Sequence, residues 1–139
     1  MGKTINEIKI GDKASVTKTI SETDVYLFAG ITGDFNPAHV NSEYAKATPF
    51  NQRIAHGMLS AGLISTVLGT KLPGPGTIYL EQQVSFLAPV FIGDTITAEV
   101  EVIAKLEKNR LKLRTTCYNQ NEKVVLHGEA IVMPRREVV

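Results

Sequence analysis

One segment limits the possible folds more than any other, because residues 56–68 predict a helix that is apolar on nearly every face. A helix of this kind belongs inside a globular protein, where other elements cover it. We therefore expect it near the centre of the fold. Its apolar side chains come from Met58, Leu59, Ala61, Leu63, Ile64, Val67 and Leu68, and its polar ones from Ser60, Ser65 and Thr66.

The chain beyond this helix alternates between apolar and polar residues with the period of two that is typical of half-buried antiparallel strands. Residues 95–102, 110–118 and 124–132 show the alternation, and residues 79–91 form a longer strand candidate. Pro89 must then lie at an edge, a bulge or an end of its strand. In the last strand the inward phase is expected at Val124, Leu126, Ala130 and Val132. These patterns predict an α+β fold in which an antiparallel sheet wraps around the buried central helix.

The part of the chain before this helix contains helical and loop signals. Ser21 begins Ser-Glu-Thr-Asp, which resembles a capping box, and apolar residues at helical spacing predict a helix over 22–32. Residues 33–39 are expected to form a loop, since Pro37 disfavours a helical conformation at the residue before it. No repeat or linker interrupts the sequence, so we predict one domain over residues 1–139.

Composition excludes several classes of function. Fifteen Lys and Arg residues against fourteen Asp and Glu residues leave a net charge of +1. Proteins that bind nucleic acid through phosphate contacts usually carry a stronger positive excess, so we expect no nucleic-acid partner. Cys117 is the only cysteine, which fits a reducing compartment. No apolar run reaches the roughly 18–20 residues that span a bilayer, so we predict a cytoplasmic protein without a membrane partner.

Three polar residues lie close together in the predicted loop. Asp34, Asn36 and His39 fall within six residues, and loops held by a rigid scaffold frequently carry catalysis. A carboxylate and an imidazole this close can divide the work of proton transfer, one accepting while the other donates. A structural interpretation is also open, in which Asp34 or Asn36 caps a turn and His39 is half buried. Spacing alone does not distinguish the catalytic interpretation from the structural one.

The start of the central helix is a second candidate. The first amides of a helix have no intrahelical partner, and that end is electropositive, which suits a carbonyl oxygen that becomes negative during reaction. Gly57 would let a ligand approach this backbone closely. Metal binding by Asp34, His39 and His56 is the competing interpretation, but no HExxH or similar spacing is present. We therefore expect no metal.

The motifs as a group resemble those of the (R)-specific enoyl-CoA hydratases of the MaoC-like dehydratase family. The resemblance is carried by residues 28–40, 53–59, 73–80 and 86–94, in the family's order and spacing. It covers nearly the whole chain, from about residue 11 to residue 134.

This resemblance implies a hot-dog fold, in which a curled antiparallel sheet wraps a long helix. It implies reversible syn addition of water to a trans-2-enoyl-CoA, of the short, crotonyl-CoA type, giving the (R)-3-hydroxyacyl-CoA. No cofactor is implied, because CoA enters as part of the substrate. Family members of this type are usually homodimers, and higher oligomers remain open.

The resemblance also implies roles for individual residues. Asp34 and His39 match the family's catalytic pair, and the Gly57 amide would bind the thioester oxygen. Asn36 would orient the loop or the water, and Ser65 occupies a position that the family places close to the active site.

Two alternatives stay open. One is a dehydratase of the same fold that acts on 3-hydroxyacyl groups on acyl-carrier protein, or on branched or dicarboxylic enoyl-CoA. The other is a module that binds acyl-CoA without turnover, although such a module has no need for the Asp34/His39 pair. Arg53 and Lys71 are candidates for the CoA phosphates, and residues 135–139 have no assigned role.

Overall fold

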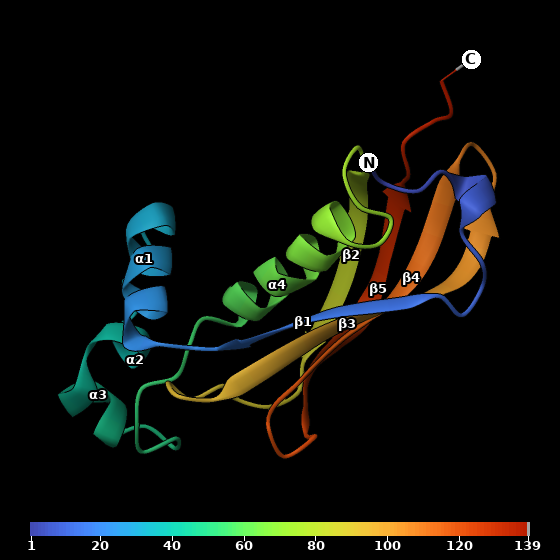
Figure 1. The fold of residues 1–139 in the computed structure, drawn as a ribbon. Helices are drawn as coiled ribbons and strands as arrows, with labels where there is room; N and C mark the ends of the chain where they lie inside the picture. Colours follow the sequence, from blue (N-terminus) through green and yellow to red (C-terminus); the bar gives the residue numbers. More distant parts are fainter. Residues whose placement is uncertain (139) are drawn as a thin grey trace.

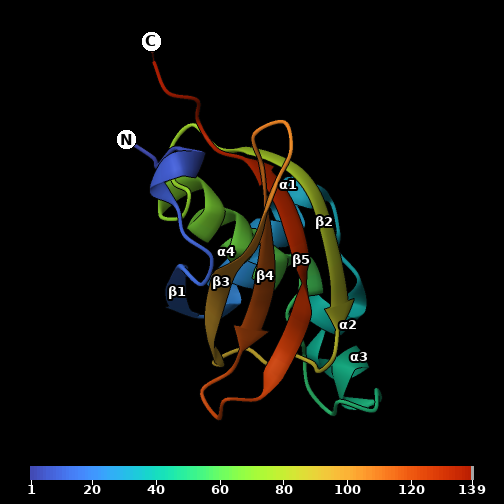
Figure 2. The ribbon, with the colours of Figure 1, turned by 90° about the vertical axis from the view of Figure 1, so that its right-hand side faces the viewer.

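A computed structural model describes residues 1–138, in which one curled antiparallel sheet packs against one long helix (Figures 1 and 2). The sheet has five strands in the order β1-β3-β4-β5-β2. A group of three helices, α1 to α3, lies beyond one end of the long helix α4 (Figure 1). This is the α+β arrangement predicted from the sequence. The elements are η1 (Ile5–Glu7), β1 (Lys13–Thr19), α1 (Glu22–Thr32), α2 (Pro37–Val40), α3 (Ser42–Lys46), α4 (Gly57–Thr70), β2 (Ile78–Phe86), β3 (Thr95–Leu106), β4 (Arg110–Tyr118) and β5 (Val124–Met133).

The two central strands have the predicted alternation. In β3 and β4 one set of side chains points into the core and is fully or almost fully buried, while the other set faces outward. Each such aliphatic side chain contributes about 1.5–3 kcal/mol through burial, so these strands form the stable wall on which α4 rests. The buried set is Ile96, Ala98, Val100, Val102, Leu111, Leu113, Thr115 and Cys117.

Helix α4 is buried on one face only. Ile64, Val67 and Leu68 pack into the core, but Met58 and Ser65 are exposed on the other side. The expectation that this chain covers the helix all round is therefore wrong for its outer face. The reason is visible in Figure 1, where the sheet covers one side of α4 and α1–α3 lie past its end.

Strand β5 departs from the predicted phase at its start. Val124 is exposed and Val125 is buried, so the inward phase begins one residue later than expected. A bulge is the cause, because Tyr118 pairs with Val124 while Cys117 already pairs with Leu126. The carbonyl of Val125 instead accepts a hydrogen bond from the Leu87 amide at 2.9 Å. From Leu126 onward the alternation is as predicted.

The segment between α1 and α3 is more regular than expected. Helix α1 covers the predicted residues 22–32, with the Ser21 hydroxyl accepting from the Asp24 amide, and Gly33 ends it with φ 80°. The expectation that His39 lies on a loop is wrong, because Pro37–Val40 form the short helix α2. Asn36 precedes that helix as its N-cap, and Pro37 occupies the first turn, where its missing N–H costs nothing.

Both ends of the chain meet at the edge of the fold opposite to α1–α3 (Figure 1). The Arg135 guanidinium donates to the Gly2 carbonyl and lies 3.7 Å from Glu7. The tail, to which the sequence assigned no role, therefore fastens the N-terminal segment. Within residues 1–138 there is no helix whose length and apolar character would let it cross a membrane.

Candidate active site

The Asp34 carboxylate stands on a short turn that its neighbours stabilise. The Asp34 amide donates to the Thr32 hydroxyl at 3.2 Å, and Asp34 Oδ1 accepts from the Asn36 amide at 3.2 Å. The carboxylate side chain is half exposed. Its Oδ2 makes no hydrogen bond among the residues that the structure describes, so this oxygen is available to a substrate or a water molecule.

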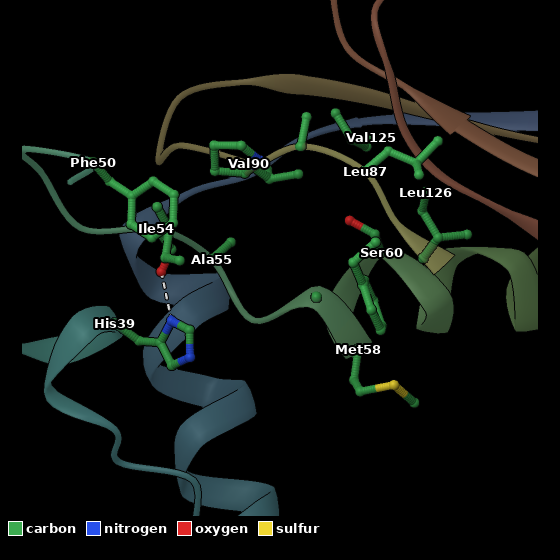
Figure 3. Close-up of a pocket in the computed structure, with 14 residues that line it drawn as sticks. His39, Phe50, Ile54, Ala55, Met58, Ser60, Leu87, Val90, Val125 and Leu126 are labelled. Carbon is green, nitrogen blue, oxygen red and sulfur yellow. Dashed lines mark hydrogen bonds between the residues drawn. The ribbon is translucent and has the colours of Figure 1, made fainter. Parts of the chain in front are cut away.

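His39 is held much more tightly. It lies on α2, it is buried, and its Nδ1 is 2.7 Å from the Ile54 carbonyl oxygen (Figure 3). A carbonyl can only accept a hydrogen bond, so Nδ1 must carry the hydrogen. Nε2 is then the nitrogen that can exchange a proton with a substrate.

A third side chain, His56, lies between these two residues. Its Nε2 is 2.9 Å from the Asp34 backbone oxygen and 4.0 Å from Asp34 Oδ2. Its ring centroid is 3.9 Å from that of His39 and 4.6 Å from that of Phe28. One nitrogen or oxygen from each of Asp34, His39 and His56 therefore lies within 4.8 Å of the others.

This cluster suits proton transfer better than it suits a metal ion. His39 Nδ1 and His56 Nε2 are engaged by backbone carbonyls. A carbonyl only accepts hydrogen bonds, so both of these nitrogens carry hydrogen and offer no lone pair to a metal. The two rings are tilted by 31°, with their centroids 3.9 Å apart.

The N-terminus of α4 adjoins the cluster. Gly57 is the first residue of that helix, where the amide has no intrahelical acceptor. The Phe86 ring packs against it so closely that a Cβ at position 57 would lie 2.6 Å from Phe86 Cε1. A larger residue here would have to displace the half-exposed Phe86 ring, and the first-turn amide of Gly57 suits the stabilisation of negative charge.

An apolar cavity of about 530 Å³ extends from this point, and we call it the His39 cavity (Figure 3). His39 lies at one end and Leu126 at the other, with Val90 and Leu87 along one side (Figure 3). Such a cavity fits a hydrocarbon group next to a reacting centre. It is lined by His39, Phe50, Ile54, Ala55, Gly57, Met58, Ser60, Phe86, Leu87, Ala88, Pro89, Val90, Val125 and Leu126.

Comparison with known proteins agrees with this geometry. Residues 4–128 match the MaoC like domain. The chain belongs to the MaoC-like dehydratase family. It is 60% identical over 128 residues to an (R)-specific enoyl-CoA hydratase of Rhodospirillum rubrum, covering 91% of this chain and 88% of that protein.

Other members of the family are similar over most of their length. The structure of the R-hydratase PhaJ1 from Pseudomonas aeruginosa superimposes with a TM-score of 0.94 at 48% identity, covering 98% of this chain and 88% of that one, which confirms the hot-dog fold. A mitochondrial 3-hydroxyacyl-[acyl-carrier-protein] dehydratase of Arabidopsis thaliana is 35% identical, covering 95% of this chain and 81% of that protein.

The remaining residues singled out by the MaoC-like resemblance lie in different places. Asn36 joins the site, where its Oδ1 accepts from the Ala38 amide at 3.1 Å and so begins the helix that carries His39. Ser65 does not join it. It lies on the outer face of α4 and lines a second cavity of about 380 Å³, together with Phe28, Tyr79 and other residues.

The two cations considered for CoA phosphates already have protein partners. Arg53 Nη2 lies 2.7 Å from Glu22, and Arg53 Nη1 donates to the Tyr26 hydroxyl at 2.9 Å. Lys71 Nζ donates to the Ser15 carbonyl at 2.7 Å.

Sequence reasoning considered His56 beside Asp34 only as a metal ligand and missed its hydrogen bond to the Asp34 backbone. The two residues are 22 apart in the chain, and no local pattern joins them. The available signal was that His56 comes directly before the glycine at the start of the central helix, which places its side chain beside any site at that helix end.

Proposed function

We propose that this protein is an (R)-specific enoyl-CoA hydratase that adds water reversibly to a trans-2-enoyl-CoA. The observation that carries the proposal is that Asp34 and His39 bring a carboxylate oxygen and a ring nitrogen within 4.8 Å of each other, beside an apolar cavity that His39 and Gly57 both line. Relatives with 44–60% identity that bear the names (R)-specific enoyl-CoA hydratase and 3-hydroxybutyryl-CoA dehydratase support it.

The reaction begins with a water molecule held between Asp34 and His39. Asp34 takes a proton from this water as its oxygen forms a bond to C3 of the substrate. The carboxylate suits this step because its side chain is half exposed and its Oδ2 faces the cluster. A positioned base of this kind contributes about 10²–10⁴ to the rate.

Electrons displaced from the C2–C3 double bond move onto the thioester oxygen, giving an enolate. The Gly57 amide donates to that oxygen, and the positive end of the α4 dipole stabilises its charge. The amide belongs to the first turn of a 14-residue helix, so the donor needs little reorganisation during the reaction.

His39 completes the reaction by donating a proton from Nε2 to C2. Its Nδ1–H bond to the Ile54 carbonyl holds the ring and stabilises the doubly protonated form that donates. Because Asp34 and His39 lie within 4.8 Å of each other, both can act from one side of the substrate, and hydrogen and hydroxyl then add to one face. The proton taken by Asp34 returns to His39 as water enters for the next cycle.

We propose CoA thioesters of short chains as substrates, with acyl-carrier-protein thioesters as the second candidate. An acyl-carrier protein is acidic and would call for a free basic patch beside the cavity. Lys46 and Arg53, which lie next to each other in a third cavity, are instead paired with Glu43 and Glu22. The Arabidopsis relative, named for an acyl-carrier-protein substrate, keeps the second candidate open to test.

We also propose that the protein works as a homodimer. Strand β2 is an edge strand with Ile78, Leu80 and Phe86 exposed, and the adjoining outer face of α4 exposes Met58. An exposed apolar edge of this kind readily pairs with another strand. Pairing of β2 with β2 of a second copy would cover it. Leu80→Lys is expected to convert a dimer to a monomer in light scattering, whereas Lys105→Glu, at an exposed position of β3 away from β2, leaves the dimer intact.

A cytoplasmic location is proposed from the cysteine. Cys117 is buried in β4 and its burial raises the pKa of its thiol to about 12, so it remains a reduced structural residue. A chain with one buried thiol suits a reducing compartment.

Hydration of crotonyl-CoA by the purified protein tests the proposal. We expect loss of the enoyl-thioester absorbance, formation of (R)-3-hydroxybutyryl-CoA, and no effect of a chelator. Asp34→Asn should lower kcat by about 10²–10⁴ because it removes the base.

Two results would contradict the proposal. Binding of crotonyl-CoA without turnover would indicate the binding module, and an Asp34→Asn variant with wild-type kcat would show that another base acts. A parallel assay with crotonyl-acyl-carrier protein distinguishes the two substrate classes through their kcat/KM values.

A further inference from the structure

The turn that carries Asp34 has little to hold it in place. Its side-chain hydrogen bonds join Thr32, Asp34, Asn36 and Ala38 to one another, and a bond from the Ile54 amide to the Ala38 carbonyl, at 3.2 Å, attaches only its far end to a distant segment. Within residues 1–138, the one hydrogen bond that links Asp34 itself to a distant element runs from His56 Nε2 to its carbonyl oxygen, at 2.9 Å. The position of Asp34 therefore depends on His56.

The same ring also contacts the second catalytic side chain. His56 lies between Phe28 of α1 and His39 of α2, with centroid distances of 4.6 and 3.9 Å. It is itself the N-cap residue of α4 and is 2% exposed. Three rings from three elements thus form one tilted stack, with interplanar angles of 46° and 31°, which joins the helices α1 and α2 to the end of α4.

Hydrogen bonding determines which nitrogen of His56 carries its hydrogen. The Asp34 carbonyl can only accept, so the hydrogen is on Nε2. His56 Nδ1 is buried and has no hydrogen-bond partner among the described residues. A second hydrogen there would be a buried donor without an acceptor, which is costly. The Nε2–H of His56 is therefore committed to the Asp34 carbonyl, and its Nδ1 is left as a buried acceptor.

We propose that His56 is a positioning residue of the hydratase reaction: it holds Asp34 through the Nε2–H bond to the Asp34 carbonyl, and it holds His39 through the contact between the two rings. This inference rests on the proposed function, in which Asp34 and His39 exchange protons with the substrate. His56 itself does not act on the substrate, because its one hydrogen is committed to the Asp34 carbonyl and its other nitrogen is buried.

Two substitutions separate the contributions of the ring. His56→Phe keeps the stack but removes the hydrogen bond, and His56→Gln keeps a donor at a similar reach but removes the stack. We expect His56→Phe to lower kcat for crotonyl-CoA by on the order of 10²-fold, the cost of displacing a catalytic group by about 1 Å. KM should stay within about threefold, because neither the cavity nor Gly57 changes. His56→Gln should retain more of kcat than His56→Phe.

A double substitution shows whether His56 acts through Asp34. In the Asp34→Asn background, His56→Phe should lower the residual kcat by less than about threefold, because the group that it positions is already gone. Hydrogen exchange gives a readout independent of activity: the amides of residues 33–36 should exchange faster in His56→Phe while those of β3 and β4 are unchanged. His127→Phe is the matched control, since His127 is exposed on the outer face of β5.

The outcomes separate this inference from the proposed function. The inference is wrong if His56→Phe keeps kcat within about twofold of the wild type, or if its full loss recurs in the Asp34→Asn background. It is also wrong if the exchange of residues 33–36 does not change. Should His56→Phe fail to fold, His56→Gln tests the inference instead. A wild-type kcat together with unchanged exchange of residues 33–36 in that variant would show the inference to be wrong. The proposed function fails instead if the wild-type protein does not hydrate crotonyl-CoA or if Asp34→Asn alone is fully active.

Discussion

The sheet with α4 and the segment α1–α3 are built in different ways. In β3, β4 and the inner face of α4, apolar side chains repeat with the period of their element and are almost completely buried. In the segment from α1 to α3, polar side chains cap short helices, and much of the surface is exposed. The first region provides stability, and the second carries Asp34 and His39 next to it.

This difference means that chemistry and stability depend on separate sets of residues. They meet at the N-terminus of α4, where Gly57 belongs to the core helix and also faces the cluster. Substitutions at the polar positions of the α1–α3 segment should therefore lower activity with little effect on unfolding, whereas its buried Val25 belongs to the core, where substitutions should do the opposite.

The largest expected effect tests the segment α1–α3. His39→Asn keeps an N–H that reaches the Ile54 carbonyl but removes the nitrogen that donates to C2. We expect kcat to fall by about 10²–10⁴ with a melting temperature close to that of the wild type. Steady-state kinetics and a thermal melt check this. A large fall in melting temperature would mean that His39 also supports the fold. Catalysis and stability would then depend on the same residue here.

The opposite substitution tests the core. Ile64→Ala removes a fully buried side chain from α4 and should lower the free energy of unfolding by about 2–5 kcal/mol. Urea unfolding measures it, and kcat below the transition should stay within about threefold of the wild type. Thr66→Ala, at an exposed position of the same helix, is the control. If Ile64→Ala lowered kcat as strongly as it lowers stability, the two regions would be coupled.

A smaller effect is expected where a cap supports the site. Asn36→Ala removes the side chain that caps α2, at a cost of about 0.5–2 kcal/mol to that local helix. Because α2 carries His39, kcat should fall by roughly tenfold while global stability hardly changes. Asn36→Asp, which can cap in the same way, should recover much of the loss. Equal activity of the Ala and Asp variants would show that the cap has no part in positioning His39.

The smallest effect concerns a residue that the reaction does not use. Cys117 is fully buried, and burial raises the pKa of its thiol to about 12. At pH 8 only on the order of 10⁻⁴ of such a thiol is ionised, so a thiol reagent should not label the folded protein or change kcat. Labelling in urea should be complete. Rapid labelling of the native protein would show that this part of the core opens readily.

The sequence predicted the core region better than the site. The alternation in β3 and β4 and the capping residues of α1 depend on near neighbours in the chain, and those predictions are confirmed. The slip at Val125 was not predictable, because the bulge arises from the pairing with β4. The contact of His56 with Asp34 likewise depends on how α4 meets the α1–α2 turn, which no local spacing encodes.

The site residues expected from the family resemblance also differ in how far their positions follow from the sequence. Asp34, Asn36 and His39 come together because they share a short segment and the cap of α2. Ser65 follows Gly57 by two turns of α4, and the outer face on which it lies leads to a different cavity. Which cavity a helix residue lines depends on the elements around the helix, and these are not visible in its own periodicity.

The strand order also determines when each element can fold while the chain is being synthesised on the ribosome. The edge strand β1 pairs only with β3, and the edge strand β2 only with β5, so each must wait for a partner that is translated later. Helix α4 is complete before β3 and β4 exist, and its apolar face has little to pack against on the nascent chain. Exposed apolar surface of this kind is what chaperones bind and what aggregation begins from. Translation of the last three strands is therefore the step that hides α4, and a ribosome that stalls before β5 leaves that helix open to the cell.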